Sequence, residues 1–244
     1  MNFKNVWTIT AKDLGLFRKK KLIMYSALVL PLVLSIGLPI IAWYVINHRN
    51  VPVQLIFPIF NAFSFFFLVL AAIIPTVIGS YSFVGEKTEK NLEPLLATPT
   101  TDDEILLGKS LAAFLPVIIM IFVSAVIFTV LMDIFTFAKV GYLYFPNLSY
   151  GIIILLNSPL ACVMSIEFSV IVSSRVNDVR SAQQLAALII IPFIALYLLT
   201  EISIITLDVN TLLLIAGILA IIDIGLFFAN RAIFQREEIL TKWK

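Results

Sequence analysis

Near the middle of this 244-residue chain stands the stretch Lys109-Ser-Leu-Ala-Ala-Phe-Leu-Pro-Val-Ile-Ile-Met-Ile-Phe-Val-Ser-Ala-Val-Ile-Phe-Thr-Val-Leu-Met132. After Lys109 it contains no charged residue. A helix of this length can cross the roughly 30 Å of hydrocarbon in a bilayer. The stretch therefore predicts a membrane-spanning helix.

Similar apolar stretches occur along the rest of the chain. Hydrophobic residues make up 61% of the sequence and charged residues only 13%, which is too apolar for a soluble domain of this length. The strand-like alternation of a membrane barrel is absent from the sequence. We therefore predict an all-α polytopic membrane protein with six transmembrane helices. The predicted spans are about 22–46, 55–83, 109–132, 150–173, 182–201 and 211–230.

The positions of the basic residues predict the orientation in the membrane. If the N-terminus is cytoplasmic, every Lys and Arg except Arg49 and Lys139 lies on the inner side. Because short cytoplasmic loops carry an excess of Lys and Arg, we expect both termini to be cytoplasmic. The number of spans is then even.

Residues 1–21 precede the first span and form a predicted amphipathic helix. One side of this helix carries Phe3, Val6, Trp7, Leu14 and Phe17. The opposite side carries Lys4, Lys12, Arg18 and Lys19. This pattern is typical of a helix that lies in the headgroup layer, and the alternative is a helix packed against cytosolic loops.

The segment 84–108 is the longest inner loop. Pro94 and Pro99 divide it, and Thr101-Asp102-Asp103-Glu104 has the spacing of a capping box that begins the next helix. An apolar patch of Leu92, Leu95 and Leu96 lies among its charges. Such a patch favours docking into a groove on a partner, whereas an ordinary solvated loop does not need it.

The same segment resembles the inner loop of the permeases of type 2 ABC exporters. The resemblance rests on Glu86-Lys-Thr-Glu-Lys-Asn-Leu-Glu93, on Leu95-Leu-Ala-Thr-Pro99 and on Glu104-Ile-Leu-Leu-Gly-Lys109. It extends to Ser173-Ser-Arg-Val-Asn-Asp-Val-Arg-Ser-Ala-Gln-Gln184 and to the tail 234–243. The chain departs from it at Lys90-Asn91, where many members have Gly-Thr.

This resemblance implies the membrane half of an exporter in a prokaryotic cytoplasmic membrane. Two copies of the chain line a path through the lipid bilayer, and two separate ABC ATP-binding subunits lie below them. ATP and magnesium are then bound by the partner subunit, and this chain holds no cofactor of its own. The residues that the resemblance assigns to coupling are Glu86, Glu89, Leu92, Glu93, Leu95, Leu96, Pro99, Arg175, Asp178 and Arg180.

Several enzymatic signals are absent from the sequence. Gly108-Lys109-Ser110 is not part of a phosphate-binding loop, because Asp103 occupies the place of the earlier glycine and no strand precedes it. His48 is the only histidine, so no histidine metal cluster is predicted. A net charge of +2 on dispersed basic residues does not indicate nucleic acid binding. We therefore predict no catalytic residue, no metal site and no nucleic acid partner.

Glu167 and Asp223 are the only acidic residues well inside predicted spans. They stand eight residues from Arg175 and Arg231, roughly 12 Å into the membrane, so the fourth and sixth spans can bring them together. Buried charges there are costly. The two acids and Asn157 therefore either line a substrate or proton path or make hydrogen bonds between helices, with Ser165 or a backbone carbonyl as further partners.

Two other functions remain open from the sequence. One is an ion-coupled secondary transporter that uses Glu167 and Asp223, although no inverted repeat is visible in the sequence. The other is a membrane scaffold without transport activity, which leaves the leucine patch of the inner loop without a transport role.

Overall fold

The structure, a computed structural model, describes residues 2–48, 53–85, 100–202 and 205–233, and these residues are almost all helical. They contain no strand, so the predicted all-α class is confirmed for this part of the chain. The α-helices in chain order are α1 (Phe3–Lys19), α2 (Lys21–His48), α3 (Val53–Ser80), α6 (Asp102–Val140), α7 (Leu148–Ile152), α8 (Ser158–Arg175), α9 (Val179–Ala186), α10 (Ile190–Glu201) and α11 (Val209–Ile233). Short π-helical or 3₁₀ turns join some of them: η1 (Tyr81–Gly85), η2 (Ile153–Asn157) and η3 (Ala187–Ile189).

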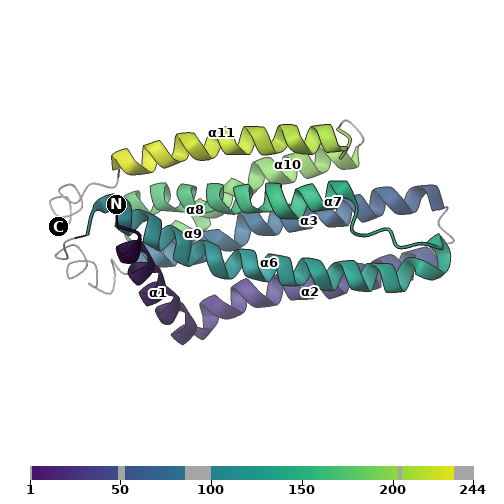
Figure 1. Cartoon of the computed structure of the whole chain (residues 1–244), viewed down its shortest axis with the longest axis horizontal. Coiled ribbons are helices and arrows are strands. Elements are labelled where there is room, and N and C mark those ends of the chain that lie inside the picture. The colour runs from purple at the N-terminus through teal and green to yellow at the C-terminus, as the bar shows by residue number, and fades with distance from the viewer. Residues whose placement is uncertain (1, 49–52, 86–99, 203–204, 234–244) are drawn as a thin grey trace.

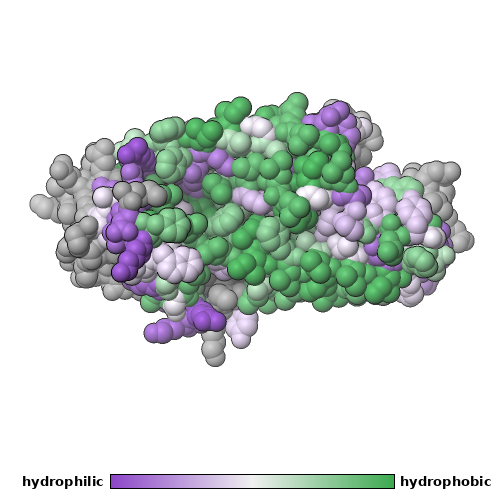
Figure 2. Space-filling model, in the orientation of Figure 1, coloured by the Kyte–Doolittle hydropathy of each residue, from purple (hydrophilic) through white to green (hydrophobic). Residues whose placement is uncertain are grey.

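Six helical runs in the described residues are long and apolar enough to cross a bilayer. They are Leu28–His48, Ile56–Gly85, Asp102–Val140, Leu148–Arg175, Val179–Thr200 and Val209–Ile233. Figure 1 shows them lying lengthwise beside one another, with α1 inclined across one end. The visible flank in Figure 2 is mostly hydrophobic, as expected for a surface that contacts lipid.

The helix α6 extends the predicted third span at both ends. At its start the Thr101 hydroxyl accepts from the Glu104 N–H at 3.3 Å, while the Glu104 carboxylate accepts from the Thr101 N–H at 3.2 Å. The predicted capping box is thus confirmed. The helix ends at Gly141, whose φ of 80° lies in the left-handed region that favours glycine. With 39 residues, α6 is about 58 Å long and must project beyond the hydrocarbon.

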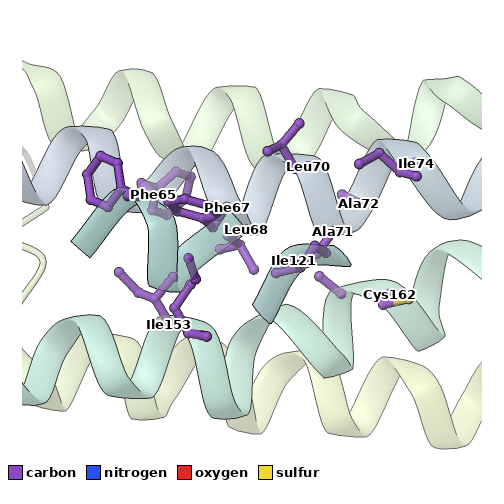
Figure 3. Packing of buried hydrophobic residues seen from close by; sticks show 14 of the residues in the cluster. Phe65, Phe67, Leu68, Leu70, Ala71, Ala72, Ile74, Ile121, Ile153 and Cys162 are labelled. Atoms are coloured by element: carbon purple, nitrogen blue, oxygen red, sulfur yellow. The ribbon is translucent and has the colours of Figure 1, made fainter. Parts of the chain in front are cut away.

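The core is built around α3. Figure 3 shows its side chains Phe65, Phe67 and Leu68 packed against neighbouring helices, together with Ile121 of α6 and Ile153 of η2. Of the 18 most apolar consecutive residues of this span, 72% are buried inside the protein. The helices that pack around α3 are α2, α6, α8, α9 and α10, whereas α11 packs on α8.

Small residues bring α3 and α8 close together. A Cβ added at Gly79 meets the Cβ of Ser169 at 3.1 Å, and the Ser165 hydroxyl donates to the Ala72 carbonyl at 2.6 Å. Small side chains at helix contacts allow backbones to approach, and this packing replaces the hydrophobic effect that is missing between helices in lipid. The contact fixes α8, and with it Glu167, against the central helix.

The N-terminal helix α1 is present, and part of its apolar side packs on the bundle. Val6 and Phe17 are buried, whereas Phe3 and Trp7 are 69% and 55% exposed. The rings of Phe3 and Trp7 can therefore contact another surface. The placement of α1 in the headgroup layer remains a prediction.

The start of α6 accommodates α1 through a glycine. A Cβ added at Gly108 meets the Cβ of Ile9 at 2.8 Å and the Val6 carbonyl oxygen at 3.0 Å. The Thr10 hydroxyl donates to the Gly108 carbonyl at 3.0 Å. A side chain larger than hydrogen at this position therefore separates the two helices.

A buried ion pair joins α1, η1 and α6 at the same place. The Lys109 Nζ lies 3.5 Å from Asp13 Oδ2 and donates to the Ser82 carbonyl at 2.9 Å. The Ser82 hydroxyl donates to the same Asp13 oxygen at 3.1 Å. The two charged side chains are 0% and 3% exposed, so the pair is shielded from water.

Replacing Gly108 with Ala is expected to destabilise the protein by about 1–3 kcal/mol, because the new methyl group overlaps Ile9 and a backbone oxygen. The control is Gly217→Ala, since a Cβ there meets no atom within 4 Å. Thermal unfolding of the two variants in detergent gives the comparison. Equal melting temperatures for both variants contradict the close contact between α1 and α6.

Replacing Lys109 with Met is expected to cost about 3–5 kcal/mol, because it breaks the buried ion pair with Asp13. The melting temperature should fall by roughly 6–20 °C. The double variant Lys109→Met with Asp13→Asn should recover part of the loss, since it also removes the buried negative charge. A double variant no more stable than Lys109→Met rules out the Asp13 charge as the cause.

Candidate functional site

Most of the predicted coupling residues lie outside the described residues. They are Glu86, Glu89, Leu92, Glu93, Leu95, Leu96 and Pro99, all within 86–99. The structure does describe both flanks of this segment, because η1 ends at Gly85 and the capping residue of α6 is Thr101. The site can therefore be examined through the elements that hold its two ends.

Both flanks are attached to α1. The Glu104 carboxylate of α6 accepts from the Asn2 N–H at 2.5 Å and from the Asn5 side-chain amide at 3.0 Å. The Asp13–Lys109–Ser82 contacts tie α1 to η1 and α6 slightly deeper in the bundle. The two ends of 86–99 are therefore attached to one unit, which consists of α1, η1 and the start of α6.

The second predicted coupling segment lies beside this unit. Arg175, Asp178 and Arg180 are all exposed, at the junction of α8 and α9. The helix α9 packs against η1 and α3, and the Gln183 amide donates to the Val77 carbonyl at 3.5 Å. The structure therefore places the second inner segment beside η1, the element that leads into 86–99.

Asp178 has a structural role in this segment. Its carboxylate accepts from the N–H and hydroxyl of Ser181 at 2.9 and 3.1 Å, which caps the start of α9. These hydrogen bonds lower the pKa of Asp178 below its usual value. The cap therefore remains ionised at neutral pH, and its contribution is lost only as acid protonates the carboxylate.

The intramembrane acids are buried between α8 and α11. Glu167 and Asp223 are 9% and 8% exposed. Within the described residues, Oε2 of Glu167 and both carboxyl oxygens of Asp223 have no hydrogen-bond partner. Each of the two helices therefore holds a buried acid with at least one carboxyl oxygen that no described residue satisfies.

Asparagines, instead of the acids, provide the hydrogen bonds between α8 and α11. The Asn230 side chain donates to the Glu167 carbonyl at 3.0 Å, and the η2 residue Asn157 donates to the Leu212 carbonyl at 3.3 Å. Ser165 bonds to α3 instead. Sequence reasoning missed Asn230, although it stands seven residues after Asp223 and so on the same side of its helix.

A cavity of about 200 Å³ opens among α6, α8 and α11. Glu167 and Asn230 line it, together with apolar side chains such as Leu111, Phe114 and Phe227. Beside it, Arg231 of α11 forms an exposed ion pair with Asp103 of α6 at 3.0 Å. The arrangement can hold a small ligand but contains no nucleophile–base pair or metal-binding cluster in the described residues.

Comparison with known families identifies the chain. A family model described as ABC-2 family transporter protein matches residues 17–179, which is more than half of the sequence and includes the inner segment 86–99. A comparison with curated proteins found no match. The six apolar helical runs agree with a multi-pass membrane transporter. The chain therefore belongs to the ABC-2 family of transporter proteins.

Proposed function

We propose that this chain is the permease subunit of an ATP-driven exporter in a prokaryotic cytoplasmic membrane. The observation that carries the proposal is the family match over residues 17–179, because the ABC-2 family implies a partner subunit that binds ATP. Two copies of the chain and two ATP-binding subunits, each holding ATP and magnesium, form the working complex. The permease itself contributes the path through the membrane.

The ATP-binding subunit docks on the inner segment 86–99. The apolar contact on this segment is made by Leu92, Leu95 and Leu96. The residues around them in sequence are Glu86, Glu89, Glu93 and Pro99. An apolar patch among charges is the surface expected of a docking site. The exposed Arg175 and Arg180 add a positively charged second contact beside η1.

Movement of the docking segment reaches the membrane through rigid elements. The segment leads at one end into η1 and α3, and at the other into the capped helix α6. Because α6 is continuous over 39 residues, a tilt at its start moves its far end as well. The buried pair of Asp13 and Lys109 makes α1 move with them. ATP-driven closure of the partner subunits can thus tilt the spans between inward-open and outward-open states.

The second candidate is an ion-coupled carrier. It is favoured by the buried Glu167 and Asp223, because Oε2 of Glu167 and both carboxyl oxygens of Asp223 have no hydrogen-bond partner in the described part of the chain. A carrier of this kind needs no ATP-binding partner. The family match favours the exporter. The composition of the purified complex separates the two.

Purification in mild detergent from the native host should recover an ATP-binding subunit in equal amount, detected by mass spectrometry. Changing Leu92, Leu95 and Leu96 together to Ser should remove it, because the apolar contact is lost. The control changes Leu143, Leu148 and Ile202 to Ser, since these exposed residues lie at the opposite end of the bundle. A homo-oligomer without an ATPase contradicts the exporter and supports the carrier.

Charge reversal of Glu89 and Glu93 to Lys should reduce the ATPase activity of the reconstituted complex at least tenfold. In the proposed docking, the two glutamates face complementary charges on the ATP-binding subunit, and lysines at these positions meet like charges instead. The matched control is Asp208→Lys, on an exposed residue that caps α11 at the other end of the bundle. Unchanged activity in the Glu89 and Glu93 variant contradicts their role in coupling, even if the complex still assembles.

A further inference from the structure

The cavity among α6, α8 and α11 has two chemically different parts. Most of its wall is apolar and includes Leu107, Leu111, Phe114, Val163, Ile166 and Phe227. Its polar groups include the side chains of Glu167 and Asn230. Figure 2 shows this flank, where a small hydrophilic area interrupts the green surface between the positions of α11 and α6 in Figure 1. A ligand that fits needs an apolar body and one polar group.

The unsatisfied atoms at the polar part are hydrogen-bond acceptors. Asn230 uses its NH₂ group on the Glu167 carbonyl, which can only accept, so its amide oxygen Oδ1 is fixed as the free atom. This oxygen and Oε2 of Glu167 are buried without a partner in the described residues. A buried acceptor without a donor costs free energy, so a donating group on the ligand is favoured.

The charge of this region selects a cation among the possible donors. Asp223 is also buried, and it precedes the cavity-lining Phe227 by one helical turn. The nearest basic residue along α11 is Arg231, which pairs with Asp103 and is 58% exposed. A bound ammonium group favours the ionised form of these carboxyl groups, and the ionised groups repel a phosphate or carboxylate ligand.

We propose that this cavity binds a compact hydrophobic primary amine, whose ammonium group donates to Glu167 and Asn230 while its apolar body contacts Phe114 and Phe227. Asp223 strengthens the attraction from one turn deeper. This amine is the class of substrate that the permease transports, an assignment that rests on the proposed function. An amine lipid with a phosphate group does not fit, because the same carboxyl groups repel the phosphate.

The test measures binding of tritiated 1-adamantylamine to the purified full-length chain in phosphatidylcholine nanodiscs, which contain no primary amine. Neutral 1-adamantanol has the same apolar cage and competes against the labelled amine. Empty nanodiscs correct for partition into lipid. The measurement needs no ATP-binding subunit, so its failure is distinct from a failure of the proposed function.

The amine should bind saturably and at least tenfold more tightly than the alcohol. Glu167→Gln should weaken amine binding at least tenfold, since the amide keeps the shape but lacks the charge, and Asp208→Asn, at the other end of the bundle, should leave it unchanged. Val163→Phe, which fills the cavity without changing a charge, should abolish binding. Equal affinity for amine and alcohol, unsaturable uptake, or native affinity in a folded Glu167→Gln or Val163→Phe protein overturns the proposal.

Discussion

Hydrocarbon offers no hydrogen-bond partner to a polypeptide backbone, and the whole architecture follows from that constraint. The crossing segments must be helices, so each peptide group is satisfied within its own segment. Several polar side chains inside the bundle obey the same rule. Ser64, Thr136 and Ser169 donate to carbonyls one turn earlier in their own helices. Against this background, any buried polar group without a partner is conspicuous.

Buried charge is treated in two different ways in this protein. Near one end of the bundle, Lys109 and Asp13 neutralise each other, and Ser82 makes a hydrogen bond with each of them. Deeper in the membrane, Glu167 and Asp223 lie together with no such partner in the described residues. An ion pair such as that of Lys109 and Asp13 holds elements in place. Buried carboxyl groups without a partner lower the stability of the protein unless a ligand or a proton satisfies them. The contrast separates a structural contact from a site available for binding.

The start of α6, which follows the inner segment, takes part in both the ion pair and the cavity. Lys109 pairs there with Asp13 of α1, and the residues of α6 that line the cavity stand on both sides of Lys109 in sequence. A movement that tilts α6 therefore changes the distance between its cavity-lining residues and Glu167 on α8. The proposed docking and the proposed ligand binding both involve this helix, so a movement of α6 would couple them.

Sequence alone was sufficient for the features that depend on local pattern. Hydrophobic stretches predicted a helical membrane protein with six spans, Thr101 and Glu104 predicted the capped start of α6, and the motifs of 86–109 predicted the family. These signals are contained within a few turns of one segment. The contact of Asp13 with Lys109, the fit of Gly108 against Ile9 and the free oxygen of Asn230 required the tertiary structure. The residues in these contacts lie on different helices and up to 99 positions apart in the sequence. The packing of the helices therefore determines which side chains meet.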